Sequence, residues 1–269
     1  MDDIQAIADT LVLARRYGQS LAAFPGEQPA TLAAAYAVQE RTLAALAATP
    51  SAWKVGMIAP EHSAALGDNR LVGPVVRIIE QGVGGSCVGV PLITGGFAAV
   101  EAELALLIGH DIPARSEAFA AEELAGYVSE VHIAAEIAGS PIAAIVDLGP
   151  TAVVADHGNN LAIVLGRRIA DWQTRSPQSL LCSVSINNTV IASGSAAQVP
   201  GGPLAALSFL VKNLARRGRA LIKGDWVSTG AMTGVHSVAP GTLAELDFGE
   251  DGRLSLHFST QPVIHDTTL

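Results

Sequence analysis

The sequence predicts an α+β fold, in which a helical N-terminal segment precedes a β-rich body with a mixed sheet. Residues 3–24 and 29–48 are amphipathic, and the second of these stretches is rich in alanine, as is typical of helices. From Trp53 onward, short apolar runs alternate with glycine and proline, which indicates strands and turns. The 269 residues are 49% hydrophobic, so the chain can bury a large core.

The N-terminal elements are delimited by clear signals. The second helix begins near Thr31 and ends before Pro50, because proline cannot continue a helix. The first apolar runs of the strand-rich part follow at residues 53–58 and 72–76. We place a boundary at residue 75, between a helical cap region (1–75) and a β-rich body (76–269), and expect the two to form one compact unit.

Two further helices are predicted within the body. Residues 117–130 have a helical pattern. Residues 203–217 give a stronger signal, because Pro203 stands in the first turn and Gly218 follows the two arginines at the end.

The C-terminal part, residues 220–260, reads as β-structure. Residues 242–246 and 253–258 alternate between apolar and polar side chains. Residues 247–252, Asp-Phe-Gly-Glu-Asp-Gly, form a plausible hairpin loop between them.

Charge and composition exclude several classes of partner. The net charge is −9, and an acidic surface repels the phosphates of nucleic acids and anionic lipids. The N-terminus lacks a signal-peptide pattern, and no apolar run reaches the roughly 20 residues that span a bilayer. With only two cysteines, we expect a cytoplasmic protein with reduced thiols. Neither a Gly-x-Ser-x-Gly elbow nor a glycine-rich nucleotide-binding motif is present.

The most informative segment is residues 97–108, where Glu101 and Glu103 stand in an apolar run. In a strand the two carboxylates share one face, whereas in a helix they diverge. Helix propensity favours the second interpretation, in which they are solvated side chains. On a buried strand they would repel each other, and either become neutral or hold a hard cation. Glu136, also in an apolar run, is a candidate third ligand.

Three other groups are candidates for chemistry. Lys54 lies in an apolar run, where it is either an edge-strand lysine in water or a buried group that binds a carboxylate or moves a proton. The pair Glu61-His62 could serve as a general base. The polar cluster 156–160 is either a surface turn or the lip of a pocket, and its residues alone favour the turn.

Taken in order, these segments resemble the fumarylacetoacetate hydrolase superfamily, and within it the branch of 2-keto-4-pentenoate hydratases and 4-oxalocrotonate decarboxylases. The resemblance covers nearly the whole chain and rests on the order and spacing of its segments rather than on one motif. The matching segments are 35–39, Lys54-Val55-Gly56-Met57, 100–105, 135–137, 146–147 with 155–159, 202–207, 221–225 and 228–230.

The resemblance implies a fold, a cofactor and a site. The Glu-x-Glu then lies on a strand of a fumarylacetoacetate-hydrolase-like roll, and Glu101, Glu103 and Glu136 bind Mg²⁺ or Mn²⁺. Lys54 becomes an active-site residue, and together with the pair Glu61-His62 proposed above it makes up the candidate catalytic residues. Asp156, Asn159 and Thr229 become candidate substrate-binding residues. It also implies a homo-oligomer that can associate with a sister enzyme of its pathway.

The implied activity is that of a metal-dependent lyase on a small 2-keto or 2-hydroxy-dienoic acid. Hydration of a 2-hydroxypentadienoate comes first, because a metal ion that chelates the carboxylate and keto oxygens stabilises an enolate. Decarboxylation of a 4-oxalocrotonate-type acid and hydrolytic C–C cleavage use the same intermediate. A different hypothesis is a non-catalytic partner subunit of such an enzyme.

The chain departs from these relatives at two places. Leu71 stands where hydratases carry an acidic residue, with Asp68 slightly earlier. Pro141 stands where many relatives have arginine after serine. Loss of either polar group could change the substrate or the reaction.

Overall fold

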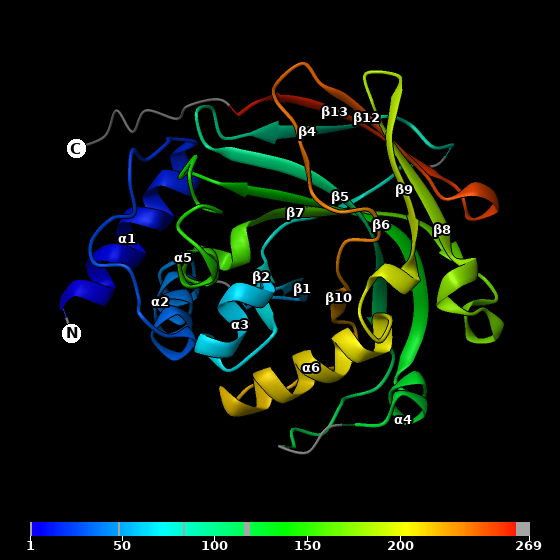
Figure 1. Cartoon of the computed structure of the whole chain (residues 1–269), viewed down its shortest axis with the longest axis horizontal. Coiled ribbons are helices and arrows are strands. Elements are labelled where there is room, and N and C mark those ends of the chain that lie inside the picture. Colours follow the sequence, from blue (N-terminus) through cyan, green and yellow to red (C-terminus); the bar gives the residue numbers. More distant parts are fainter. Residues whose placement is uncertain (1, 48, 83, 116–118, 262–269) are drawn as a thin grey trace.

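Two β-sheets form the body of the molecule, and helices gather along one side of them (Figure 1). The computed structural model describes residues 2–47, 49–82, 84–115 and 119–261. In this part of the chain, one sheet has the order β2-β1-β10-β5-β6-β7-β3, with β11 also paired to β5, and the other has the order β4-β13-β12-β8-β9. The predicted α+β fold is confirmed.

The larger sheet is mixed and the smaller one is mostly antiparallel. Strands of the larger sheet are β1 (Ala52–Met57), β2 (Arg70–Val75), β3 (Ile78–Glu80), β5 (Phe97–Ile108), β6 (Val128–Ser140), β7 (Asn160–Ile169), β10 (Trp226–Ser228) and β11 (His236–Ser237). Those of the smaller sheet are β4 (Val88–Leu92), β8 (Leu181–Ile186), β9 (Thr189–Ser195), β12 (Leu243–Asp247) and β13 (Arg253–Thr260).

The helices lie mainly at the N-terminal side of the molecule, where α1, α2, α3 and α5 cluster in Figure 1, away from the β8–β9 hairpin. Their bounds are α1 (Asp2–Tyr17), α2 (Leu32–Ala45), α3 (Pro60–Leu66), α4 (Ala121–Ala125), α5 (Pro150–Ala155) and α6 (Pro203–Arg216). None of the described helices is both long and apolar enough to cross a membrane.

Local signals set several helix ends. Thr31 caps α2 by accepting a hydrogen bond from the backbone N–H of Ala34 at 3.2 Å. Helix α6 begins at Pro203 and ends at Arg216, which confirms the prediction for this segment. Helix α1 ends at Tyr17, because Gly18 takes a left-handed conformation (φ 65°) and stops it earlier than the predicted residue 24.

The predicted helix over residues 117–130 is wrong in its second half. Only α4 is helical among its described residues, and β6 begins at Val128. The reason is tertiary: Val128, Val131 and Ile133 are buried, and from Val128 onward β6 pairs along the whole length of β5. Branched side chains on a buried sheet outweigh the local helical pattern.

The predicted boundary at residue 75 falls within one sheet. Strands β1 and β2 precede it, yet β1 pairs in parallel with β10, whose residues lie 174 positions further along at Ala52↔Trp226. The helical region and the β-rich body therefore share backbone hydrogen bonds as well as a hydrophobic core.

A tight turn after α5 packs backbone against backbone on β2. His157, Gly158 and Asn159 all have positive φ (58°, 65° and 52°). A Cβ at Gly73 would lie 2.1 Å from the carbonyl oxygen of His157, so only glycine fits there. The left-handed turn is thus held in place by the close approach of β2, and it turns Asn159 toward the cavity described below.

The same turn buries a neutral histidine. His157 Nε2 lies 2.6 Å from the hydroxyl of Thr42, which donates its own proton to the carbonyl of Gln39 at 2.7 Å. Thr42 must therefore accept, and Nε2 of His157 carries the proton. Burial, with a smaller contribution from the charge of Arg15, lowers the pKa of His157 to about 3.

This burial makes stability depend on pH. In the unfolded chain His157 gains a proton below its ordinary pKa of 6.5, whereas in the folded chain it does so only near 3. Its contribution is therefore complete above pH 6.5 and is lost as the pH falls toward 3, with a slope of up to about 1.4 kcal/mol per pH unit. We expect His157→Asn, measured by urea unfolding in metal-free buffer, to be less stable than the wild type at neutral pH. The difference in the free energy of unfolding between the wild type and the variant should become smaller as the pH falls. A difference that does not change with pH would contradict the burial of a neutral His157.

Candidate active site

Strands β5 and β6 bring three carboxylates together. Glu101 and Glu103 share one face of β5, and Glu136 of β6 lies directly opposite Glu101 in the antiparallel register. Carboxylate oxygens of the three residues lie within 4.8 Å of one another. All three side chains are buried, with exposed fractions of 7%, 1% and 0%. The strand interpretation of residues 97–108 is confirmed, because β6 and β10 supply hydrogen-bond partners on both edges.

Glu103 and Glu136 each have one carboxylate oxygen that is hydrogen-bonded by the protein and one that is not. Glu103 Oε2 accepts hydrogen bonds from the hydroxyl of Ser228 and from the backbone N–H of Gly230. Glu136 Oε1 accepts one from Asn160 Nδ2 at 3.0 Å. Glu103 Oε1 and Glu136 Oε2 are buried without a hydrogen-bond partner. Buried carboxylate oxygens left in this way are the ligands that a hard divalent cation needs, so the residues fit Mg²⁺ or Mn²⁺.

Lys54 is brought to the same cluster from β1. Parallel pairing sets Lys54 beside Ser228 of β10, and Ser228 in turn lies beside Ala105 of β5. Lys54 Nζ is 3.3 Å from Glu136 Oε1, and both side chains are buried. Burial acts to lower the pKa of Lys54, but the charges of the three glutamates outweigh it and keep the pKa above its ordinary value.

The cluster holds more acidic groups than basic ones. Burial, and then the charge of Glu136, raises the pKa of Glu101 to about 8. The same two causes, with Glu101 added, raise the pKa of Glu103 well above its ordinary value. When all three are ionised, three carboxylates face a single ammonium group, and a divalent cation would balance the remaining charge and lower these pKa values.

A cavity of about 570 Å³ opens onto this cluster. Glu101 and Lys54 line its inner end, and Glu61, His62 and Asn159 also line it. Glu61 and His62 are exposed on α3, a short helix with no buried residue. The structure thus brings four of the predicted residues, the triad and Lys54, into one cluster, and it places three more, Glu61, His62 and Asn159, around the cavity.

Two predicted substrate-binding residues have other contacts. The carboxylate of Asp156 is buried in an ion pair with Arg15, and it is not among the residues lining the cavity. The hydroxyl of Thr229 donates to the carbonyl of Leu104 at 3.0 Å. Both positions hold the backbone around the site: Asp156 precedes the left-handed turn, and Thr229 follows the Ser228 that binds Glu103.

Reasoning from the sequence missed two contacts to the carboxylates. Ser228 and Asn160 each hydrogen-bond a glutamate of the triad, yet each stood next to a residue chosen instead. A signal existed for Ser228, because alternation in β10 places it on the opposite face from the buried Val227. No such signal existed for Asn160. Its position beside Glu136 depends on the left-handed turn formed by the preceding residues, and that turn is a product of packing.

The two departures have different surroundings. Leu71 lines the cavity, so an apolar side chain stands in its wall. Asp68 does not replace an acid there, because it lies in a different cavity and forms a 3.4 Å ion pair with Arg216. Pro141 is buried and accepts a hydrogen bond from the backbone of Leu21 at 2.8 Å.

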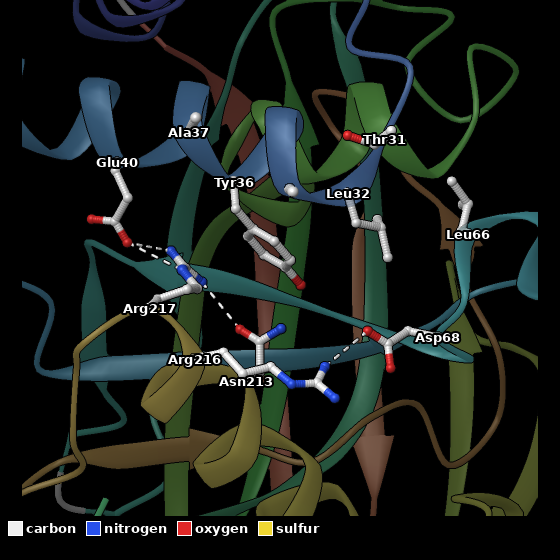
Figure 2. Close-up of a pocket in the computed structure, with 11 residues that line it drawn as sticks. Thr31, Leu32, Tyr36, Ala37, Glu40, Leu66, Asp68, Asn213, Arg216 and Arg217 are labelled. Atoms are coloured by element: carbon white, nitrogen blue, oxygen red, sulfur yellow. Dashed lines mark hydrogen bonds and ion pairs between the residues drawn. The ribbon is translucent and has the colours of Figure 1, made fainter. Parts of the chain in front are cut away.

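A second cavity, also about 570 Å³, lies between α2 and the end of α6 (Figure 2). Tyr36 points into it from α2, toward Asn213 of α6. Its charges are paired among themselves: Arg217 binds Glu40 at 2.6 Å, and Arg216 faces Asp68. It lacks the uncompensated carboxylates of the first cavity, which is therefore the better candidate for chemistry.

The fold and the site together define a class of protein: a β-rich roll with a buried carboxylate cluster, of a kind that can hold a divalent cation, at the inner end of a cavity. The chain belongs to the fumarylacetoacetate hydrolase family, since the family model described as "Fumarylacetoacetate (FAA) hydrolase C-terminal" matches residues 52–258. The resemblance predicted from the sequence is confirmed.

Relatives within the family carry two activities in their names. A 4-oxalocrotonate decarboxylase of Pseudomonas putida is 30% identical over 39% of this chain and 40% of its own length. A 2-keto-4-pentenoate hydratase of Burkholderia vietnamiensis (strain G4) is 29% identical over 71% of each chain. The first match thus spans well under two thirds of that relative.

Solved structures share the fold over nearly the whole chain. A 4-oxalocrotonate decarboxylase from Pseudomonas putida G7, complexed with magnesium and adipate, has a TM-score of 0.77 at 22% identity and covers 96% of this chain and 97% of its own. The same enzyme complexed with calcium and acetate has a TM-score of 0.78.

We predict that Glu103→Gln removes metal binding and stabilises the metal-free protein. The amide keeps the size of the carboxyl group and is neutral at every pH, so folding no longer loses stability by raising the pKa of this buried group. Affinity for Mn²⁺ in calorimetric titration should fall at least about 100-fold, since even the loss of an indirect partner of a metal costs 10–100-fold. In metal-free buffer the thermal midpoint should rise, and added Mn²⁺ should raise it only for the wild type.

Glu245→Gln is the matched control, because Glu245 pairs with exposed Arg253 on the smaller sheet. Wild-type affinity for Mn²⁺ should also increase as the pH is raised toward 8, since the metal must displace a proton from Glu101. Equal stabilisation of the wild type and Glu103→Gln by Mn²⁺ would contradict the assignment of this site.

Proposed function

We propose that this protein is a divalent-metal-dependent hydratase that adds water to a 2-hydroxy-2,4-dienoic acid, with Mg²⁺ or Mn²⁺ at Glu101, Glu103 and Glu136. The observation that carries the proposal is the buried triad with a lysine 3.3 Å from Glu136, at the inner end of a cavity. When bound, the cation would act as a Lewis acid toward a chelating 2-keto acid. The hydratase names among the relatives support this choice of reaction.

The residues of the chain suit the separate parts of such a reaction. Net hydration of 2-hydroxypenta-2,4-dienoate moves the proton of the 2-hydroxyl to C5, then adds the oxygen of water at C4 and its proton at C3. Lys54, fixed by Glu136, is placed to bind the substrate carboxylate or to move the proton of the 2-hydroxyl. Glu61 and His62 line the cavity from α3 and are candidates to take a proton from the attacking water.

Decarboxylation of a vinylogous keto acid is the second candidate. The match to named decarboxylases supports it, both in sequence and in a fold with a TM-score of 0.78. That reaction breaks a C–C bond to release CO₂ and leaves a proton on carbon in its place. It needs the same inner carboxylates and lysine, so the outer part of the cavity must decide between the two.

We expect Lys54→Met to lower the kcat of the Mn²⁺-loaded protein on 2-hydroxypenta-2,4-dienoate by at least about 100-fold, the usual contribution of a positioned acid or base. Loss of dienol absorbance gives the rate, and the appearance of 4-hydroxy-2-ketopentanoate identifies hydration. CO₂ released from 4-oxalocrotonate would identify the decarboxylase instead.

Lys223→Met is the matched control, because Lys223 is exposed and only its backbone N–H makes a hydrogen bond, to Asp111. In the presence of Mn²⁺, the thermal midpoints of both variants should lie within a few degrees of that of the wild type. Absence of metal-dependent turnover of any such acid by the wild type would refute the proposed function. Full activity of Lys54→Met would refute the role of the lysine.

A further inference from the structure

The outer part of the active-site cavity is apolar and exposed. Met57, Val146 and Val235 line it with exposed fractions of 48%, 53% and 57%, unusually high for side chains of this kind. Phe97 and Leu71 also line the cavity. Apolar side chains gathered at the wall of a binding cavity are typically covered by an apolar part of the ligand.

The strand β5 gives this cavity a direction. Phe97 and Glu101 both line it and lie on the same face of β5, four residues apart, which corresponds to roughly 13 Å along a strand. Phe97 pairs with Ser140 at the end of β6, and the chain that follows carries Ala143 and Val146, which also line the cavity. The carboxylate cluster therefore lies at one end, and Phe97, Ala143 and Val146 form the other, which we call the distal end.

No positive charge stands at the distal end. Among the described residues that line the cavity, the basic ones are Lys54, which is paired with Glu136, and His62 on α3. The acidic residue Asp147 adjoins Val146 and lines the cavity as well. A second carboxylate on a substrate would lose hydration against Phe97 and Val146, without a partner and near a like charge.

The volume of the cavity also favours a substrate with an uncharged extension at its far end. Its volume of about 570 Å³ lies in the range that holds ligands of drug size, and a five-carbon acid would fill only a small part of it. Space beyond the carboxylate cluster is available for a longer substrate, and its walls are apolar.

We infer that the substrate is a monocarboxylic 2-keto or 2-hydroxy-dienoic acid whose far end carries an uncharged alkyl or aryl group, held by Phe97, Ala143 and Val146. This inference rests on the proposed function and specifies its substrate class. It separates the protein from an enzyme for dicarboxylic acids, in which the distal end must satisfy a second negative charge.

Two unreactive keto acids test this directly, because they differ only at the distal end. 2-Oxodecanoate ends in a methyl group and 2-oxodecanedioate in a carboxylate, at the same chain length, and both are long enough to extend from the carboxylate cluster toward the distal end. We expect calorimetric titration of the Mn²⁺-loaded protein to give at least about 30-fold tighter binding of 2-oxodecanoate, because an apolar pocket leaves a buried carboxylate unpaired. Val146→Lys should reduce this preference by about threefold or more, by adding a partly exposed cation at the distal end.

Val190→Lys is the matched control, since Val190 is 64% exposed on the edge strand β9. This substitution should leave the preference for the monocarboxylic acid unchanged. Equal or tighter binding of 2-oxodecanedioate by the wild type would overturn the inference, and so would a preference unaffected by Val146→Lys. Binding is measured without turnover, so these results are independent of which reaction occurs. If neither keto acid binds, the inference and the proposed function fail together, whereas turnover of dienoates with a preference for the dicarboxylic acid overturns the inference alone.

Discussion

The repulsion between carboxylates on neighbouring buried strands is the constraint around which this structure is organised. Glu101 and Glu136 are directly opposite each other in an antiparallel pair, an arrangement that destabilises a sheet unless the charge is balanced. Lys54 balances part of it through Glu136, and two buried oxygens still lack a partner. A fold that retains this cost points to a ligand that removes it, and a divalent cation has the charge and the preference for oxygen to do so.

The surrounding architecture fixes the carboxylates in place before any ligand arrives. The parallel pairing of β1 with β10 sets Lys54 beside Ser228, and Ser228 holds Glu103. On the other side, the left-handed turn at residues 157–159 packs on β2 because Gly73 has no side chain. Asn160 follows this turn and hydrogen-bonds Glu136. Glu103 and Glu136 are thus each oriented by a hydrogen bond from a different part of the chain, which limits rearrangement when a metal or substrate binds.

The two ends of the active-site cavity have different physical characters and divide the work. The inner end holds the carboxylates and Lys54, and suits the proposed binding and activation of a keto acid. The distal end is formed by side chains such as Phe97 and Val146 that carry no charge. Leu71 is a further part of this apolar wall. Selectivity among substrates is therefore expected to depend on residues that take no part in bond making.

The sequence by itself determined the elements with strong local signals and, through its resemblance to a family, which three glutamates form the cluster. Helix α6, bounded by Pro203 and Gly218, and the hairpin of β12 and β13 needed no tertiary information. Propensity alone would have made residues 97–108 a helix, and only pairing with β6 and β10 makes them a strand. The contacts of Ser228 and Asn160 with the glutamates, and the apolar distal end, were likewise decided by the tertiary structure. Register between strands distant in sequence is set by the packing of the whole sheet, and no local pattern encodes it.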